Sequence, residues 1–335
     1  MGIKNLLKFL NSYPDLIETT NIDKFSGKKI AIDISILLYQ IIISVRNSGA
    51  DLTNKKGEIT SHILGLFNKT INLLSKKIIP IYVFDGRPPQ LKKKILDMRK
   101  KIRKKAEDKM NNADNLDDKI KYFKRSVIIN KNNLDDCREL LDLMGIPYIN
   151  APEEADSQCA WLAKNGYVDS VLTEDMDILT FGSPSIIRNL TSVNKNPLEI
   201  KLNKIKEKFN WTQDEFIYFC ILLGCDYCDR VGDNNCFELF KNFQKSKNID
   251  SVLKEYDKYI EYKNTFEYFK NPLIEKKEFN FKIRKPNFNH LNDLLVNKYG
   301  LIKWKIKRKL EKLRTSYIYF NNNSNVASLL HNYQE

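Results

Sequence analysis

Histidine and cysteine are scarce in this 335-residue sequence, and this scarcity excludes several kinds of site. Only three histidines are present, namely His62, His290 and His331. Cys225 and Cys228 form a C-x-x-C pair, but no second pair follows, so the spacing of a zinc site is missing. For the six cysteines we therefore expect reduced, buried thiols rather than a disulfide framework.

A long hydrophobic run is also missing. The longest apolar stretch, ILLYQIIISV, is too short to span a bilayer. The N-terminal segment MGIKNLLKFLNSYPD turns polar too early for a signal peptide, and Leu6 stands where a myristoylation motif needs Ser or Thr. We expect a soluble, intracellular protein that does not bind membranes.

Acidic residues are outnumbered, since 56 Lys and Arg face 42 Asp and Glu and give a formal net charge of +14. The basic residues cluster in two helical patterns, Leu91–Lys105 and Lys298–Arg314. The apolar stripe of the first pattern is too narrow for a core helix. Basic blocks of this kind favour a polyanionic partner, with nucleic acid ahead of an anionic membrane surface.

Short β-branched runs alternate with helical patterns along the first two thirds of the chain. Strands are predicted at KKIAIDIS (28–35), IIPIYVFDG (78–86), IPYI (146–149) and VDSVL (168–172), with helices between them. Gly145 is expected to cap one of these helices, and Pro152 to open the next. This order predicts an α/β fold with a mostly parallel central sheet flanked by helices. A polar helical insert interrupts it at 91–130.

Acidic residues gather at the carboxyl ends of these strands. Asp33 and Asp85 each stand at a strand end, and Asp175 and Asp177 stand just beyond a third. Asp226 follows a further apolar run, and Glu154 and Asp156 complete a set of seven. The carboxyl ends of parallel strands share one edge of a sheet, where unpaired carboxylates would repel one another. Oxygen ligands without histidine suit two magnesium ions, with manganese as a possible substitute, and such a pair of ions serves phosphodiester hydrolysis. Taken singly, each acid could instead cap a helix or complement its dipole.

Seven sequence blocks together resemble the flap endonucleases, the structure-specific 5′ nucleases of DNA replication and repair. The blocks are MGIKNLLKFL, GKKIAIDIS, EITSHILGLFNKT, PIYVFDGRPPQLK, LLDLMGIPYINAPEEAD, TEDMDILTFGSP and ILLGCDYC. They run in order from residue 1 to about residue 229. The resemblance implies that Asp33, Asp85, Glu154 and Asp156 serve mainly one ion. It implies that Asp175, Asp177 and Asp226 serve mainly the other, with Asp175 also counted as catalytic.

The resemblance also implies roles for residues outside the acidic set. Lys92 and Arg99 match the two basic residues at the base of the family's helical arch, which steer the scissile phosphate. Tyr39 matches an aromatic residue on which a base stacks. Three further residues match positions near bound DNA, namely Gly2, Arg46 and Thr60. By composition alone, Lys92 and Arg99 would be solvated charges and Tyr39 a core residue.

Two departures from the family pattern concern partners. The segment DYCDRVGDNNCFELF is shorter than the family's helix-two-turn-helix motif, although Gly232 remains. Whether potassium binds there is left open, and the basic helix at 298–314 could compensate through phosphate contacts. No Q-x-x-[ILM]-x-x-aromatic-aromatic motif appears near the end, so a sliding-clamp tail is not supported.

The resulting expectation is a single nuclease domain over 1–335. Its parts are an N-terminal region (1–90), an arch (91–130), an internal region (131–229), a helical duplex-binding region with a degenerate helix-two-turn-helix (230–315) and a tail (316–335). The expected substrates are branched DNA with a 5′ flap, nicked or gapped duplex and RNA-primed 5′ ends. The expected protein is a monomer acting in a nucleus or at a viral replication site. The alternatives are a catalytically weak scaffold that binds DNA junctions and a single-strand ribonuclease.

Overall fold

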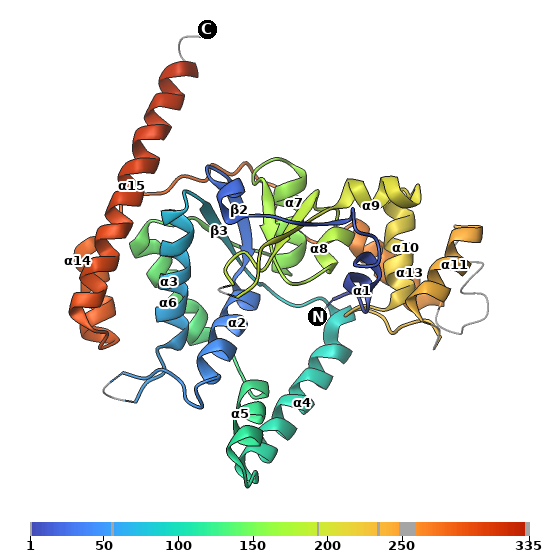
Figure 1. The fold of residues 1–335 in the computed structure, drawn as a ribbon, viewed down its shortest axis with the longest axis horizontal. Helices are drawn as coiled ribbons and strands as arrows, with labels where there is room; N and C mark the ends of the chain where they lie inside the picture. Colours follow the sequence, from blue (N-terminus) through green and yellow to red (C-terminus); the bar gives the residue numbers. More distant parts are fainter. Residues whose placement is uncertain (1, 55–56, 193, 233–234, 248–258, 332–335) are drawn as a thin grey trace.

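A seven-stranded sheet forms the centre of the computed structural model, which describes residues 2–54, 57–192, 194–232, 235–247 and 259–331 (Figure 1). Its strands, in spatial order, are β1 (Ile17–Thr19), β7 (Leu198–Lys201), β6 (Ser185–Arg188), β5 (Ser170–Leu172), β2 (Lys29–Asp33), β3 (Ile79–Phe84) and β4 (Tyr148–Asn150). The five strands from β6 to β4 are parallel to one another, while β7 pairs antiparallel with both β6 and the edge strand β1. The predicted mostly parallel sheet is confirmed.

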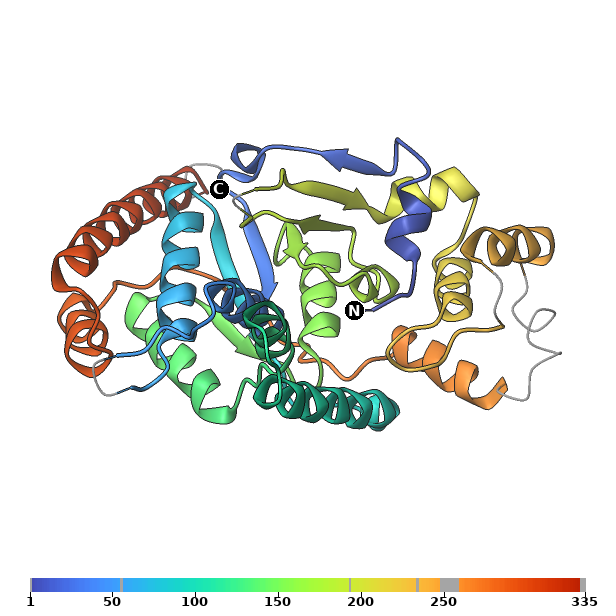
Figure 2. The same ribbon diagram turned by 60° about the horizontal axis from the view of Figure 1, so that its bottom comes forward.

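The sheet separates two apolar layers, because side chains along each strand point alternately to its two faces. In β2, Ile30 and Ile32 face one layer and Ala31 faces the other, as the two-residue period of a strand requires. Both faces are buried, which explains why these strands read as continuous apolar runs. Figure 2 shows helices on both sides of the sheet.

One layer is covered by helices from the first, middle and last thirds of the chain. They are α2 (Ile34–Arg46), α3 (Ser61–Ser75), α6 (Lys131–Met144), α14 (Phe288–Asn292), the π-helix η3 (Asp293–Lys298) and α15 (Lys303–His331). Gly145 caps α6 with a φ of 70°, as predicted. The region expected to be a tail from residue 316 is helical as far as the described residues extend, because α15 continues to His331. The helix starts at Lys303, five residues after the predicted start at Lys298.

The other layer is covered by a second set of helices. They are α1 (Leu6–Leu10), α7 (Ala155–Lys164), α8 (Asp177–Thr180), α9 (Leu202–Phe209), α10 (Gln213–Leu223), α11 (Cys236–Ser246) and α13 (Tyr259–Lys270). A short 3-10 helix, η1 (Ile22–Phe25), precedes β2. Among the described residues, no helix is long and apolar enough to cross a membrane.

The predicted insert forms a helical hairpin that projects from the body (Figure 1). It consists of η2 (Gln90–Lys92), α4 (Lys93–Asn111) and α5 (Leu116–Arg125). In α4 only Ala106 is buried, and Met98 and Ile102 are exposed. This confirms the prediction that the apolar stripe is too narrow for a core helix.

An extended segment, residues 271–287, connects α13 to α14 and is called the strap below. The Gln158 side chain holds it at one end, since its Nε2 donates to the Glu275 carbonyl and its Oε1 accepts from the Glu275 amide. At the other end the Arg284 amide donates to the Gly145 carbonyl at 2.8 Å. The strap therefore carries the chain from one helical layer to the other.

Candidate active site

Three adjacent parallel strands, β5, β2 and β3, bring acidic residues to one edge of the sheet. Asp33 is the last residue of β2, Asp85 follows β3, and Asp175 and Asp177 follow β5. The strands are paired directly, β2 with both β3 and β5, so their carboxyl ends lie side by side. The predicted clustering of these strand-end acids is confirmed.

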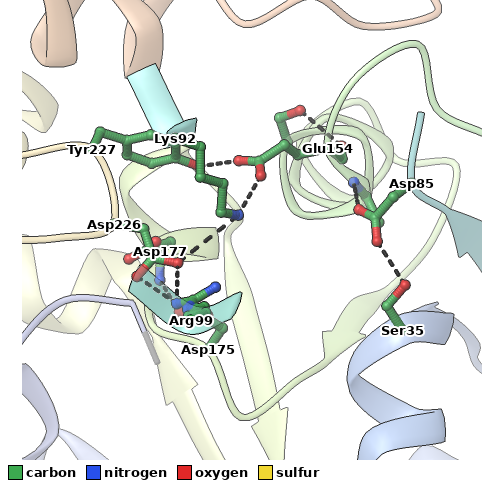
Figure 3. Close-up of polar contacts among 11 residues, drawn as sticks. Ser35, Asp85, Lys92, Arg99, Glu154, Asp175, Asp177, Asp226 and Tyr227 are labelled. Carbon is green, nitrogen blue, oxygen red and sulfur yellow. Dashed lines mark hydrogen bonds and ion pairs between the residues drawn. The ribbon is translucent and has the colours of Figure 1, made fainter. Parts of the chain in front are cut away.

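Asp33 caps a helix and also faces another acid. Its Oδ1 accepts from the backbone amides of Ser35 (2.7 Å) and Ile36 (3.2 Å), the N-cap arrangement that the simpler interpretation foresaw. Burial and the charge of Asp85 nevertheless raise the pKa of Asp33. Asp85 accepts from the Ser35 hydroxyl at 2.6 Å and from the Ala155 amide at 2.9 Å, so both its oxygens are oriented (Figure 3).

Glu154 and Asp156 lie at the N-terminus of α7, which begins at Ala155 rather than at Pro152. Residues two apart on a regular helix do not face the same way. Glu154 precedes the first helical turn, so this restriction does not apply to Glu154 and Asp156. Asp156 is 7% exposed, and its Oδ1 has no hydrogen-bond partner. Burial and the charges of Asp175 and Asp33 raise its pKa.

Asp175 and Asp177 are held close together against the N-terminal segment. The Asp177 amide donates to Asp175 Oδ1 at 3.1 Å, and the Asp177 Oδ1 is buried without a partner. Burial raises the pKa of both carboxyls. Gly2 has a φ of +77°, and a Cβ built on it would lie 1.7 Å from Asp175 Oδ1. Only glycine fits at position 2 without displacing the acidic pair.

The two predicted arch cations reach into this acidic group (Figure 3). Lys92 donates to Glu154 Oε1 and lies 3.9 Å from Asp226 Oδ2, while Arg99 Nη2 bonds Asp226 at 2.6 and 2.8 Å. Burial opposes the charge of Lys92, but the nearby carboxylates outweigh it and raise its pKa. Ion pairs therefore connect the base of the hairpin to the acidic group.

The carboxylates do not form a ready cation site as the side chains stand. No group of three or more His, Cys, Asp or Glu side chains within the described ranges is placed to hold a metal ion. Lys92 and Arg99 engage Glu154 and Asp226 instead. The residues still fit divalent cations, since the donors are all oxygen and the buried Oδ1 atoms of Asp156 and Asp177 have no hydrogen-bond partner.

The remaining predicted residues have mixed surroundings. Tyr39 is half-buried on α2, and Gly232 has a positive φ of 59° next to two residues outside the described ranges. Arg46 pairs with Asp51 at 3.0 Å and donates to the Phe123 carbonyl, and Thr60 is 1% exposed. As they stand, Arg46 and Thr60 are engaged in internal contacts rather than presented for DNA.

Sequence reasoning missed two residues at the site. Ser35 orients Asp85, as described above. Tyr227 is 3% exposed, and its hydroxyl donates to Glu154 Oε2. The only available signal for Tyr227 was its position beside Asp226. Glu174 lies in the same TEDMD stretch as Asp175 and Asp177, but it forms an ion pair with Arg188 of β6 at 2.8 Å.

Comparisons with known proteins agree with this geometry. The XPG N-terminal domain matches residues 1–106, and the XPG I-region matches residues 145–226. Flap endonuclease 1 of Glycine max is 40% identical over 333 residues, which cover 94% of this chain and 87% of that protein. Flap endonuclease 1 of Aedes aegypti is 42% identical over 295 residues, covering 83% and 77% respectively.

Solved structures show the same fold. Flap endonuclease-1 from Methanococcus jannaschii superimposes with a TM-score of 0.74 at 31% identity, covering 90% of this chain and 96% of that one. The catalytic core of Rad2 in complex with DNA substrate gives 0.70 at 22% identity, covering 93% and 100%, and supports the fold alone. Identity of this extent over nearly the whole chain, together with the strand-end acids and the basic arch, shows that the chain belongs to the flap endonuclease family.

Proposed function

We propose that this protein is a structure-specific 5′ nuclease that hydrolyses the phosphodiester bond at the junction of a single-stranded 5′ flap and duplex DNA. The same site would act as a 5′ to 3′ exonuclease on nicked or gapped duplex and on RNA-primed 5′ ends during replication and repair. The observation that carries the proposal is the meeting of Lys92 and Arg99, at the base of a basic helical hairpin, with Glu154 and Asp226 of the acidic group.

Two divalent cations, magnesium or manganese, fit the acidic side chains. Asp33, Asp85, Glu154 and Asp156 would hold mainly one ion. Asp175, Asp177 and Asp226 would hold mainly the other. Bound ions would neutralise charge on the phosphate and lower the pKa of a water nucleophile.

Lys92 and Arg99 would bind and orient the scissile phosphate. Both are only partly exposed, at 13% and 27% of their side chains, and each is held within reach of the acids. A phosphate entering the site can replace Glu154 and Asp226 as their partner, and the two cations, already largely buried, would lose little further hydration. Fixed donors of this kind act on the charge that develops in the transition state.

The DNA itself would be held around this site. Tyr39 would stack on a base, and Gly2 and Gly232 would allow a close approach of the backbone. Arg46 and Thr60 would act on DNA through the loop and the hairpin that they support. The exposed lysines and arginines of α4 and α15 would contact phosphates, which makes binding weaken steeply with salt.

The first test is cleavage of a 5′-labelled double-flap DNA in magnesium, in manganese and in excess chelator, beside a 3′-flap control. We expect a short metal-dependent product from the 5′ flap and none from the control. Asp175→Asn should abolish the cut while retaining flap binding. Binding without cleavage in either metal would favour the scaffold alternative, and preference for single-stranded RNA would favour a ribonuclease.

A further inference from the structure

The aromatic residue that follows Asp226 touches both an acid and a cation of the site. We propose that Tyr227 is a positioning residue that holds Glu154 and Lys92 in their working geometry, and that α13 supports it from behind. The inference rests on the proposed nuclease function. It adds a residue that neither the strand ends nor the basic arch indicates.

Glu154 is held by two donors, one on each oxygen. The Tyr227 hydroxyl donates to Oε2 and Lys92 donates to Oε1, as Figure 3 shows. The Lys92 Nζ also lies 5.7 Å from the centroid of the Tyr227 ring, within range of a cation–π contact. Tyr227 thus fixes the Glu154 carboxylate with its hydroxyl and faces the Lys92 ammonium group with its ring.

The loop that carries Tyr227 is itself constrained. The Cys225 amide donates to the Cys228 carbonyl at 3.0 Å, which closes a tight turn around Asp226 and Tyr227. Within this turn, Asp226 holds Arg99 and Tyr227 contacts Lys92. A four-residue turn therefore sets the positions of both arch cations relative to the sheet edge.

Two rings from α13 support Tyr227 on its far side. Tyr268 lies 4.9 Å and Phe269 5.3 Å from it, measured between ring centroids. Phe181, just after α8, packs on Phe269 at 5.1 Å. Since α8 begins with Asp177, this aromatic cluster joins α13 of the expected duplex-binding region to both halves of the acidic site.

Tyr227→Phe tests the role of the hydroxyl, because it keeps the ring and its packing and removes only the donor to Glu154. The matched control is Tyr148→Phe on β4, which removes a hydroxyl bond of 3.0 Å to Asp142 of α6. Supporting groups around metal ligands typically contribute 10- to 100-fold in activity or in metal affinity. We expect Tyr227→Phe to lower the single-turnover rate at saturating flap DNA by about this factor, with DNA affinity changed less than about twofold.

Two further measurements separate positioning from a general loss of structure. Manganese binding without DNA, followed by electron paramagnetic resonance of the free ion, should weaken about tenfold in Tyr227→Phe and remain unchanged in Tyr148→Phe. In a double-mutant cycle, Tyr227→Phe should have a much smaller effect in a Lys92→Ala background. An unchanged rate, unchanged manganese affinity or additive effects would each overturn the proposal.

The same experiments distinguish failure of this inference from failure of the proposed function. A wild-type protein that binds manganese but cuts no DNA would refute the nuclease function. The manganese comparison between Tyr227→Phe and wild type would still decide whether Tyr227 positions the acidic site.

Discussion

Position 2 offers the sharpest test of the site geometry, because an added methyl group there would collide with a proposed ligand. In Gly2→Ala the new Cβ would lie 1.7 Å from Asp175 Oδ1 and 2.7 Å from Asp177 Oδ1. Non-bonded heavy atoms normally stay about 3.5 Å apart, so Gly2 and Asp175 must separate by about 1.8 Å. The substitution therefore displaces either the N-terminal segment or the acidic pair.

Gly2→Ala has two expected effects, a loss of folding stability from the backbone and a loss of cleavage rate from the displaced site. An alanine at a φ of +77° destabilises the fold by about 1 kcal/mol, since its Cβ crowds the backbone in the left-handed region. A misplacement of about 1 Å at a reacting centre can lower the rate about 100-fold, which corresponds to about 2.7 kcal/mol of transition-state stabilisation. We expect a small loss of stability and a large loss of activity.

Gly166→Ala separates the two parts. Gly166 has a φ of +75°, and nothing lies within 4 Å of a Cβ built on it, so alanine there meets the same backbone strain without a collision. Single-turnover cleavage of flap DNA and thermal melting should be measured for both variants. Comparable melting with cleavage lowered only in Gly2→Ala is the expected result. Equal cleavage rates in the two variants would refute the contact between Gly2 and Asp175.

Three other outcomes are expected. Lys92→Ala should lower the single-turnover cleavage rate about 10²- to 10³-fold, with the dissociation constant for flap DNA changed less than about threefold. Burial lowers the pKa of His62 below its ordinary 6.5, so the unfolded chain binds the proton more tightly and stability falls as the pH drops below about 6.5. The stability difference between wild type and His62→Gln, measured by urea unfolding, should therefore shrink from pH 7.5 to about 5.5. Arg46→Ala should lower the free energy of unfolding by about 2 kcal/mol, because Asp51 loses its charged partner, and should speed hydrogen exchange in α5.

Each of these has a control and a contrary result. Lys93→Ala removes an exposed charge next to Lys92, and an equal loss of rate in both variants would refute a specific role for Lys92. A His62 stability difference that grows on acidification would mean that Asp136 raises the pKa instead. Arg125→Ala changes an exposed residue of α5, and an equal effect on exchange would argue against the Arg46 contact.

The buried parallel strands were predictable because both their faces are apolar, which produces runs such as that around β2. The strands β1, β6 and β7 were not predicted. They have only three or four residues each, and β1 (IET) and β7 (LEIK) carry charges, so their sequences contain too few apolar positions to indicate a strand. The start of α7 was misplaced because Pro152 is compatible with a first turn but does not require one.

Four acids of the site, Asp33, Asp85, Asp175 and Asp177, could be predicted from strand ends, since topology alone brings those positions together. The contacts that complete the site depend on residues far apart in the chain and leave no local pattern. The bonds from Lys92 and from Tyr227 to Glu154 span 62 and 73 residues. Arg46 was matched to a DNA-facing position, whereas its partner Phe123 lies 77 residues away on the hairpin.

The layer shared by α3, α6 and α15 has a consequence for how the protein is made. Leu66, Phe67 and Leu140 are completely buried in a cluster completed by Leu313 and Phe320. While the ribosome is still synthesising the strap, this apolar face has no cover, and at typical elongation rates the wait for α15 is on the order of ten seconds. During that interval the nascent chain would present a large apolar surface to chaperones, and final closure of the nuclease core would follow the emergence of α15.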